Sequence, residues 1–183
     1  MSVTTIPMAE RASAESTSEL FDRLLAEEGP ALARVAASYA ADRARSEDLF
    51  QEICLAIWQA LPRFRGESSL RTFVFRIAHN RGLAAVARRG PGVEPLEIAE
   101  QVADAAASPE LSADRRQRRE RLAVAVQQLH LPLRQVLTLA LEGLAQREIA
   151  EVLGISEGNV AVRLTRARKA LKKLLGEEGG AHR

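Results

Sequence analysis

A stretch near the C-terminus, residues 146–160, constrains the fold most, because its apolar, small and glycine positions have the spacing of two helices that cross closely. Ile149 and Leu153 are one helical turn apart and share a face. Ala150 is small where a second helix must approach, and Gly154 stands where the connecting turn requires a positive φ. The stretch therefore predicts a helix-turn-helix.

The second helix of this motif is expected to begin after a serine that can cap it and to present a polar, basic outer face. Polar groups near its start suit base edges, and cations along it suit phosphates. The candidate duplex-binding residues are Ser156, Asn159, Arg163, Arg166 and Lys169. Ala161 and Val162 can offer only apolar contact, for example to thymine methyl groups. An ordinary helical hairpin with a solvated basic face is the alternative.

Charge is segregated along the chain, although the formal net charge is only +2. Residues 1–60 hold 5 basic and 10 acidic side chains, whereas residues 61–90 hold 7 basic and 1 acidic. Residues 91–113 hold 5 acids and no base, and residues 114–183 hold 14 bases and 8 acids. Two basic blocks divided by an acidic one indicate two surfaces that meet a polyanion, with an acidic face free for another partner.

The chain as a whole predicts helices rather than sheets. Ala and Leu dominate its apolar residues and no stretch alternates convincingly, so we expect an all-α fold of two small helical domains. Pro30 is expected to open a helix, and Ser46 to cap the next one. Pro62 should stop that helix, and Ser69 should cap a long helix after it. The segment 91–113 contains several prolines and little periodicity, which predicts a flexible linker.

Several classes of function are not expected from the composition. Cys54 is the only cysteine, which excludes an internal disulfide framework, and the three histidines are scattered, so we expect no metal site. The chain carries no phosphate loop or nucleophile elbow, so we expect no catalytic residues, no cofactor and no enzyme activity. No apolar run is long enough to cross a membrane, and residues 1–17 are too polar for a secretory signal. The expected location is the cytoplasm.

A second block, residues 46–89, carries a pattern that resembles a known family. It contains Asp48-Leu49 followed by Gln51-Glu52, then Phe64-Arg65-Gly66, and Asn80 before Arg88-Arg89. This pattern resembles domain two of the extracytoplasmic-function (ECF) group of bacterial sigma factors, and residues 131–174 resemble sigma domain four. The two blocks stand in the same order as the two domains of the family, and the chain of 183 residues has the small size of the ECF group.

The resemblance implies an alternative sigma factor that binds core RNA polymerase, recognises the −35 and −10 promoter elements and promotes DNA melting. Its partners would be core polymerase and promoter DNA, with an anti-sigma protein as a further partner that the family commonly has. The implied division is a disordered tail over 1–17, domain two over 18–90, a linker over 91–113, domain four over 114–176, and a frayed tail over 177–183.

The resemblance also assigns roles to residues of this chain. Those that would dock on the clamp helices of the polymerase largest subunit are Asp48, Gln51 and Glu52. Those that would bind the −10 element are Phe64, Arg65, Gly66, Ser68, Arg76 and Asn80. The arginines that could hold phosphates of a separated strand are Arg63, Arg65, Arg71, Arg76 and Arg81. The helix-turn-helix residues given above would bind the −35 element.

Three alternatives stay open at this point. A stand-alone helix-turn-helix regulator without polymerase docking would explain the C-terminal motif alone. Asp48 could cap a helix as well as dock, and Asn80 could be a helix-stabilising side chain. Trp58 lies on an apolar helix face, which predicts a core position rather than a surface hot spot.

Overall fold

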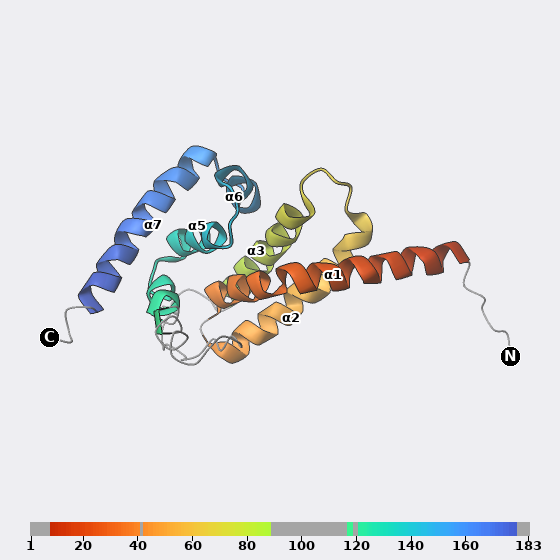
Figure 1. Ribbon diagram of the computed structural model, residues 1–183, viewed down its shortest axis with the longest axis horizontal. Helices are drawn as coiled ribbons and strands as arrows, with labels where there is room; N and C mark the ends of the chain where they lie inside the picture. Colours follow the sequence, from red (N-terminus) through yellow and green to blue (C-terminus); the bar gives the residue numbers. More distant parts are fainter. Residues whose placement is uncertain (1–7, 41, 89–116, 119–120, 179–183) are drawn as a thin grey trace.

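The protein is described by a computed structural model over residues 8–40, 42–88, 117–118 and 121–178, and every described element is helical (Figure 1). The all-α prediction is confirmed. The elements are α1 (Met8–Tyr39), α2 (Arg43–Ala60), the 3₁₀ turn η1 (Leu61–Arg63), α3 (Leu70–Arg88), α5 (Leu131–Leu141), α6 (Gln146–Leu153) and α7 (Glu157–Glu178). Residues 121–127 are helical as well. None of the described helices combines the length and apolarity needed to cross a bilayer.

The first helix is longer than the sequence predicts. We expected a tail over 1–17 and a helix opened by Pro30, whereas α1 begins at Met8 and runs straight through that proline. A proline inside a helix removes one backbone hydrogen bond. Here the same helix buries Leu24, Leu32 and Val35 along one stripe, and this continuous packing offsets the loss.

The start of α2 also differs from the prediction. Ser46 was expected to be the N-cap, but the helix begins at Arg43 and its N-cap is Asp42, whose carboxylate accepts a hydrogen bond from the Arg45 N–H at 2.8 Å. Both residues are good caps, and the chain uses the one that lies a turn earlier. The cap predicted for α3 is confirmed, because Ser69 Oγ accepts from the Thr72 N–H at 3.0 Å.

Helices α1 and α3 cross closely at Gly82. A Cβ atom there would overlap the ring of Tyr39. That ring is buried and its hydroxyl is 2.6 Å from Nδ1 of buried His79, so it cannot swing aside. Burial lowers the pKa of His79 and raises that of Tyr39, so both side chains are neutral near pH 7.

This crossing gives a stability prediction. Gly82→Ala should lower the free energy of unfolding by about 1–3 kcal/mol, because the added methyl group overpacks a site that cannot relax. Gly176→Ala is the matched control, since Gly176 is also helical, in α7, but has open space around its Cβ position. The control should be neutral or slightly stabilising. Urea unfolding of both variants would measure the difference, and equal midpoints would contradict the close crossing.

The C-terminal unit is built around the expected helix-turn-helix. The turn between α6 and α7 has Gly154 at φ 65°, the left-handed region that favours glycine. Ser156 Oγ accepts from the Asn159 N–H at 3.2 Å and so caps α7 as predicted. On the far side of α6, Gly143 at φ 82° turns the chain out of α5. The predictions for Gly154 and Ser156 are confirmed.

The two helical units pack against each other. Helix α3 lies beside α6 and α1 lies beside α5 (Figure 1). One buried apolar cluster runs through both units, from Leu32 and Val74 on one side to Val136 and Ile149 on the other. A smaller cluster holds α7 to the end of the 121–127 helix and to α5. The predicted linker, residues 91–113, lies outside the described residues.

Candidate polymerase and nucleic-acid interfaces

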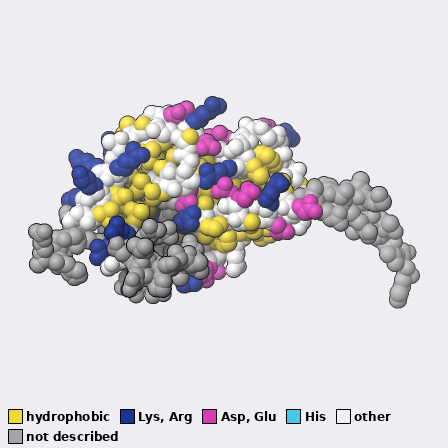
Figure 2. All heavy atoms as spheres, viewed as in Figure 1, with side chains coloured by type: hydrophobic (Ala, Val, Ile, Leu, Met, Phe, Trp, Pro, Cys, Tyr) yellow, Lys and Arg dark blue, Asp and Glu magenta, His cyan; other side chains and the backbone are white. Residues whose placement is uncertain are grey.

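The outer face of α7 is the first candidate site, and the packing of the helix-turn-helix fixes its direction. Ile149 and Val152 of α6 and Val160 and Leu164 of α7 are buried together. The opposite side of α7 must therefore face solvent. The predicted residues on that side are exposed, except for a half-buried Arg163; they are Ser156, Asn159, Arg166 and Lys169. Figure 2 shows Lys and Arg side chains gathered at the left of the molecule, where α7 lies.

Two of these side chains are coupled. The Arg163 Nε–H donates to Asn159 Oδ1 at 2.9 Å. This bond uses the amide oxygen and one guanidinium N–H, so the Asn159 N–H₂ group and the other guanidinium N–H groups can still donate. The exposed Val162 lies between them in sequence, with 49 % of its surface accessible, and offers an apolar contact beside the polar pair.

The α2 face is the second candidate site. Asp48, Gln51 and Glu52 are all exposed on this helix, and Glu52 shares its carboxylate with Arg88 of α3 at 3.0 Å. Asp48 is not the helix cap, because Asp42 has that role. An exposed carboxylate with no role in the helix end is free to meet a partner.

The same helix carries apolar surface that the sequence analysis missed or misplaced. Trp58 was expected in the core, but 39 % of it is exposed, and its ring meets Phe21 edge-on at 5.2 Å. Leu55, four residues after Gln51, is 58 % exposed. The signal was available, because Leu55 falls one turn beyond the acidic and amide group, on its side of the helix. The α2 face therefore combines acidic, amide and apolar side chains.

The third candidate site is the segment from η1 into α3. Phe64 and Phe73 stack at a tilt, with ring centroids 4.8 Å apart. Gly66 has φ 73° in the connecting loop, and Arg65 beside it is exposed. An open hollow of about 480 Å³ is lined by Pro62, Arg63, Phe64 and Arg65. An aromatic face and two cations around a hollow suit a nucleic-acid base and its phosphates.

Two more predicted residues of this third site lie on α3. Asn80 is exposed, and Arg76 lies one turn before it. Arg76 is not free of protein contacts, because its Nη1 lies 3.8 Å from the Glu151 carboxylate of α6. Ser68 is half-buried and donates from Oγ to the Ser69 carbonyl at 3.3 Å. Cys54 is half-buried on α2, and burial raises the pKa of its thiol, so it is not activated.

Comparison with known proteins agrees with this layout. Residues 24–91 match the model of sigma-70 region 2, and residues 119–171 match that of sigma-70 region 4. The chain is 33 % identical to the RNA polymerase sigma factor CnrH of Cupriavidus metallidurans over 172 residues, which cover 89 % of this chain and 90 % of that protein. It is also 33 % identical to the ECF RNA polymerase sigma-E factor of Escherichia coli, over 68 % of this chain and 70 % of that one. The chain belongs to the ECF sigma factors.

Solved structures of other ECF sigma factors have the same fold. CnrH in complex with the cytosolic domain of CnrY superposes with a TM-score of 0.64 at 28 % identity, over 91 % of this chain and 94 % of that one. RpoE of Bartonella quintana, in complex with the anti-sigma factor NepR, superposes with a TM-score of 0.70 at 25 % identity, over 85 % and 96 %. This ECF sigma factor is thus an alternative sigma factor for transcription initiation, and nothing in the comparisons supports a stand-alone regulator. The roles of individual residues stay predictions.

Proposed function

We propose that this sigma factor docks on core RNA polymerase through the α2 face, defined by Asp48, Gln51 and Glu52. These side chains are exposed and free of helix-capping roles. Leu55 and Trp58 add apolar surface in the next turns. An apolar anchor beside charged groups is the usual make-up of an interface hot spot, and acidic groups suit a basic partner helix. In the family this helix meets the clamp helices of the largest polymerase subunit.

For the −10 element, the site consists of the hollow at η1, the following loop and the outer face of α3. Phe64 offers an aromatic face, Arg65 and Arg76 offer cations, and Gly66 and Ser68 shape the loop between them. Asn80 is an exposed amide that can hydrogen-bond to a base edge once that base has left the stack. DNA melting then follows because the protein binds the open state of the promoter more tightly than the closed state, and no catalytic group is needed.

For the −35 element, α7 enters the major groove of duplex DNA. Asn159 and Arg163 act as one hydrogen-bonded unit toward base edges, and Arg166 and Lys169 contact phosphates. Ser156 lies at the N-terminus of the helix, where it meets the groove first. The observation that carries the proposal is that two exposed polar and basic groups, on α7 and around α3, lie on separate helical units, because a sigma factor must contact duplex and separated DNA at different points.

An anti-sigma protein is a further partner in this proposal. The solved relatives are bound to CnrY and to the anti-sigma factor NepR, and this chain shares the fold of both relatives. We place the protein in the cytoplasm, where RNA polymerase is, and assign it no enzyme activity and no cofactor.

The test is transcription reconstituted from purified parts. Core RNA polymerase with this protein should start transcripts at a few discrete positions on genomic DNA of the source organism, and mapped 5′ ends should share two upstream sequence elements. Core polymerase alone is the control, and its transcripts should start at scattered positions and at the ends of the DNA. Equal patterns with and without the protein would overturn the proposal.

A further inference from the structure

The contact between the two helical units has a polar rim centred on Glu142, at the C-terminal cap of α5. Its two carboxylate oxygens accept from Nε and Nη2 of Arg34 on α1, both at 2.7 Å. The Glu142 side chain is only 8 % exposed. A bidentate arginine–carboxylate pair with one partner largely withdrawn from water is the strong form of such a contact.

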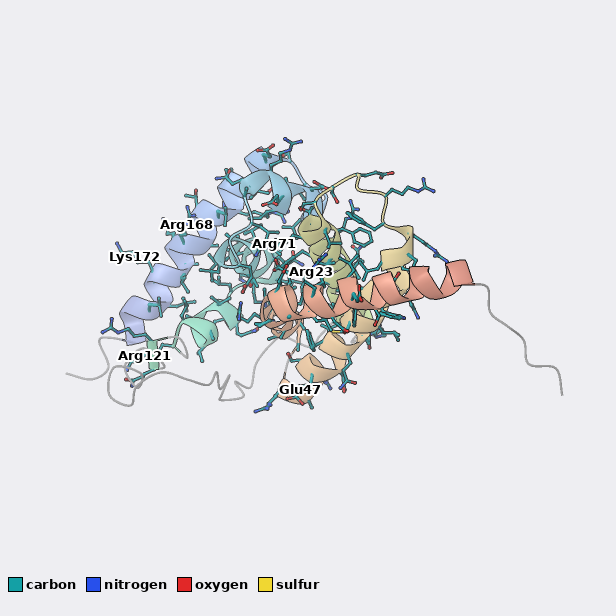
Figure 3. All side chains as sticks on the ribbon, turned by 45° about the vertical axis from the view of Figure 1, so that its right-hand side comes forward. Arg23, Glu47, Arg71, Arg121, Arg168 and Lys172 are labelled. Atoms are coloured by element: carbon teal, nitrogen blue, oxygen red, sulfur yellow. The ribbon has the colours of Figure 1, made fainter. Side chains whose placement is uncertain are left out.

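Glu142 also holds α3 through its backbone. Its carbonyl oxygen accepts from Arg71 Nη2 at 2.6 Å, and Arg71 also meets the carboxylate of Glu28 at 2.9 Å. The carbonyl groups at the end of α5 carry the negative end of the helix dipole, which favours a cation there. Figure 3 labels Arg71 in the middle of the molecule, where α1, α3 and α5 meet. One residue of the C-terminal unit thus binds two helices of the other unit, α1 and α3.

Helix α6 adds acidic contacts to the same face of α3. Glu151 lies 3.8 Å from Arg76 Nη1, and Glu148 Oε1 accepts weakly from Thr72 Oγ1 at 3.5 Å. Below this rim, Gln127 Nε2 donates to the Ala37 carbonyl at 2.8 Å, and the apolar core continues across the contact. The rim therefore seals an interface that is apolar inside.

We infer that the α5–α6 unit locks the strand-binding face of α3, with Glu142 as the latch. The inference rests on the proposed function, because it takes Arg76 and its neighbour Arg71 as groups that hold phosphates of the −10 strand. In the locked form the Glu142 carbonyl accepts from Arg71, and the Glu151 carboxylate lies 3.8 Å from Arg76 Nη1. A DNA strand and the C-terminal unit then compete for the same cations.

The lock has a measurable consequence. If only a fraction of the molecules is open, the apparent affinity for a single strand falls by that fraction. Weakening the latch raises the open fraction and so tightens strand binding. Arg34→Ala tests the lock by the direction of the change in affinity. Removing a positive charge should weaken the binding of any polyanion, so tighter binding would have to come from opening of the lock.

The experiment compares Arg34→Ala with Arg23→Ala in the full chain. Both changes remove one arginine from α1, but Arg23 is exposed and stands about three helical turns before Arg34. Fluorescence anisotropy with a short labelled single-stranded DNA should show Arg34→Ala binding roughly 3- to 10-fold tighter than the parent. Arg23→Ala should bind equally or more weakly. Small-angle scattering should show a larger radius of gyration for Arg34→Ala alone.

A second variant separates failure of the lock from failure of the proposed function. Adding Arg76→Ala to Arg34→Ala should remove most of the gain in single-strand affinity, because the Arg76 guanidinium that the open lock exposes is then missing. Binding by Arg34→Ala at or below the level of Arg23→Ala overturns the lock, even if Arg76→Ala still weakens the parent protein. If Arg76→Ala changes nothing in either background, the assignment of this face to the DNA strand fails, and the lock fails with it.

Discussion

Asp48→Arg is expected to weaken binding to core RNA polymerase by on the order of 30-fold or more. Losing one partner of a desolvated charge pair costs about 2–5 kcal/mol, and the reversed charge adds repulsion from a basic helix. Folding should be unaffected, because Asp48 is exposed and the cap of α2 is Asp42. Surface changes of this kind alter the free energy of unfolding by about 0.5 kcal/mol or less.

The matched control is Glu27→Arg, the same charge reversal at an exposed position of α1. Competition for core polymerase against a labelled parent protein measures both variants. The double change Gln51→Ala with Glu52→Ala should also weaken binding to core polymerase. Part of that loss would come from Arg88, which loses its ion-pair partner Glu52. Parent-like binding by Asp48→Arg would show that α2 docks elsewhere or not at all.

The helix-turn-helix could be predicted in detail because its signals are local. Gly154 adopts a positive φ in the turn, and Ser156 caps the N-terminus of α7. Neither feature depends on distant parts of the chain. The same is true of Ser69 at the start of α3. Such positions are fixed by backbone geometry within one turn.

Other features depend on packing that the sequence does not display. Pro30 is a common helix opener, yet it stays inside α1 because the apolar stripe on both sides is buried as one surface. Trp58 has the periodicity of a core residue, but Phe21 covers only part of it. The contact between the two units could not be predicted from the sequence either, since Glu142, Arg34 and Arg71 come from separate regions of the chain.

The candidate sites show the same division. The identities of Asp48, Asn80 and Asn159 were readable as motif positions, and all three are exposed. Their surroundings were not readable, because the Asn159–Arg163 bond and the Arg76–Glu151 contact depend on side-chain geometry. The spacing of Leu55, one turn beyond Gln51, puts it on the same side of α2, but nothing in the sequence indicates that it is 58 % exposed.

Arg163→Ala and Asn80→Ala are expected to fail at different stages of initiation. Arg163→Ala removes a candidate base contact and frees the Asn159 amide, so duplex binding at the −35 element should weaken by about 1–3 kcal/mol and lose specificity. Arg166→Ala should instead weaken binding uniformly and reduce the salt slope by about one, as expected for a phosphate contact. Asn80→Ala should leave duplex binding unchanged.

The loss in Asn80→Ala should lie in melting. Asn80 is exposed on α3 and can reach a base edge only after that base leaves the stack. Its substitution should therefore reduce the fraction of open complexes without changing the affinity of closed ones. Arg81→Ala is a useful comparison, because Arg81 is exposed on the same helix and is a candidate phosphate contact, so this change removes a charge beside Asn80 and keeps the amide.

Permanganate reactivity of unpaired thymines, measured on one promoter with polymerase and each variant, tests the division between the two DNA-binding faces most directly. At equal promoter occupancy, Asn80→Ala should show clearly weaker reactivity around the −10 element, whereas Arg163→Ala should match the parent protein. Parent-like reactivity with Asn80→Ala, or reduced reactivity with Arg163→Ala at full duplex affinity, would contradict the account.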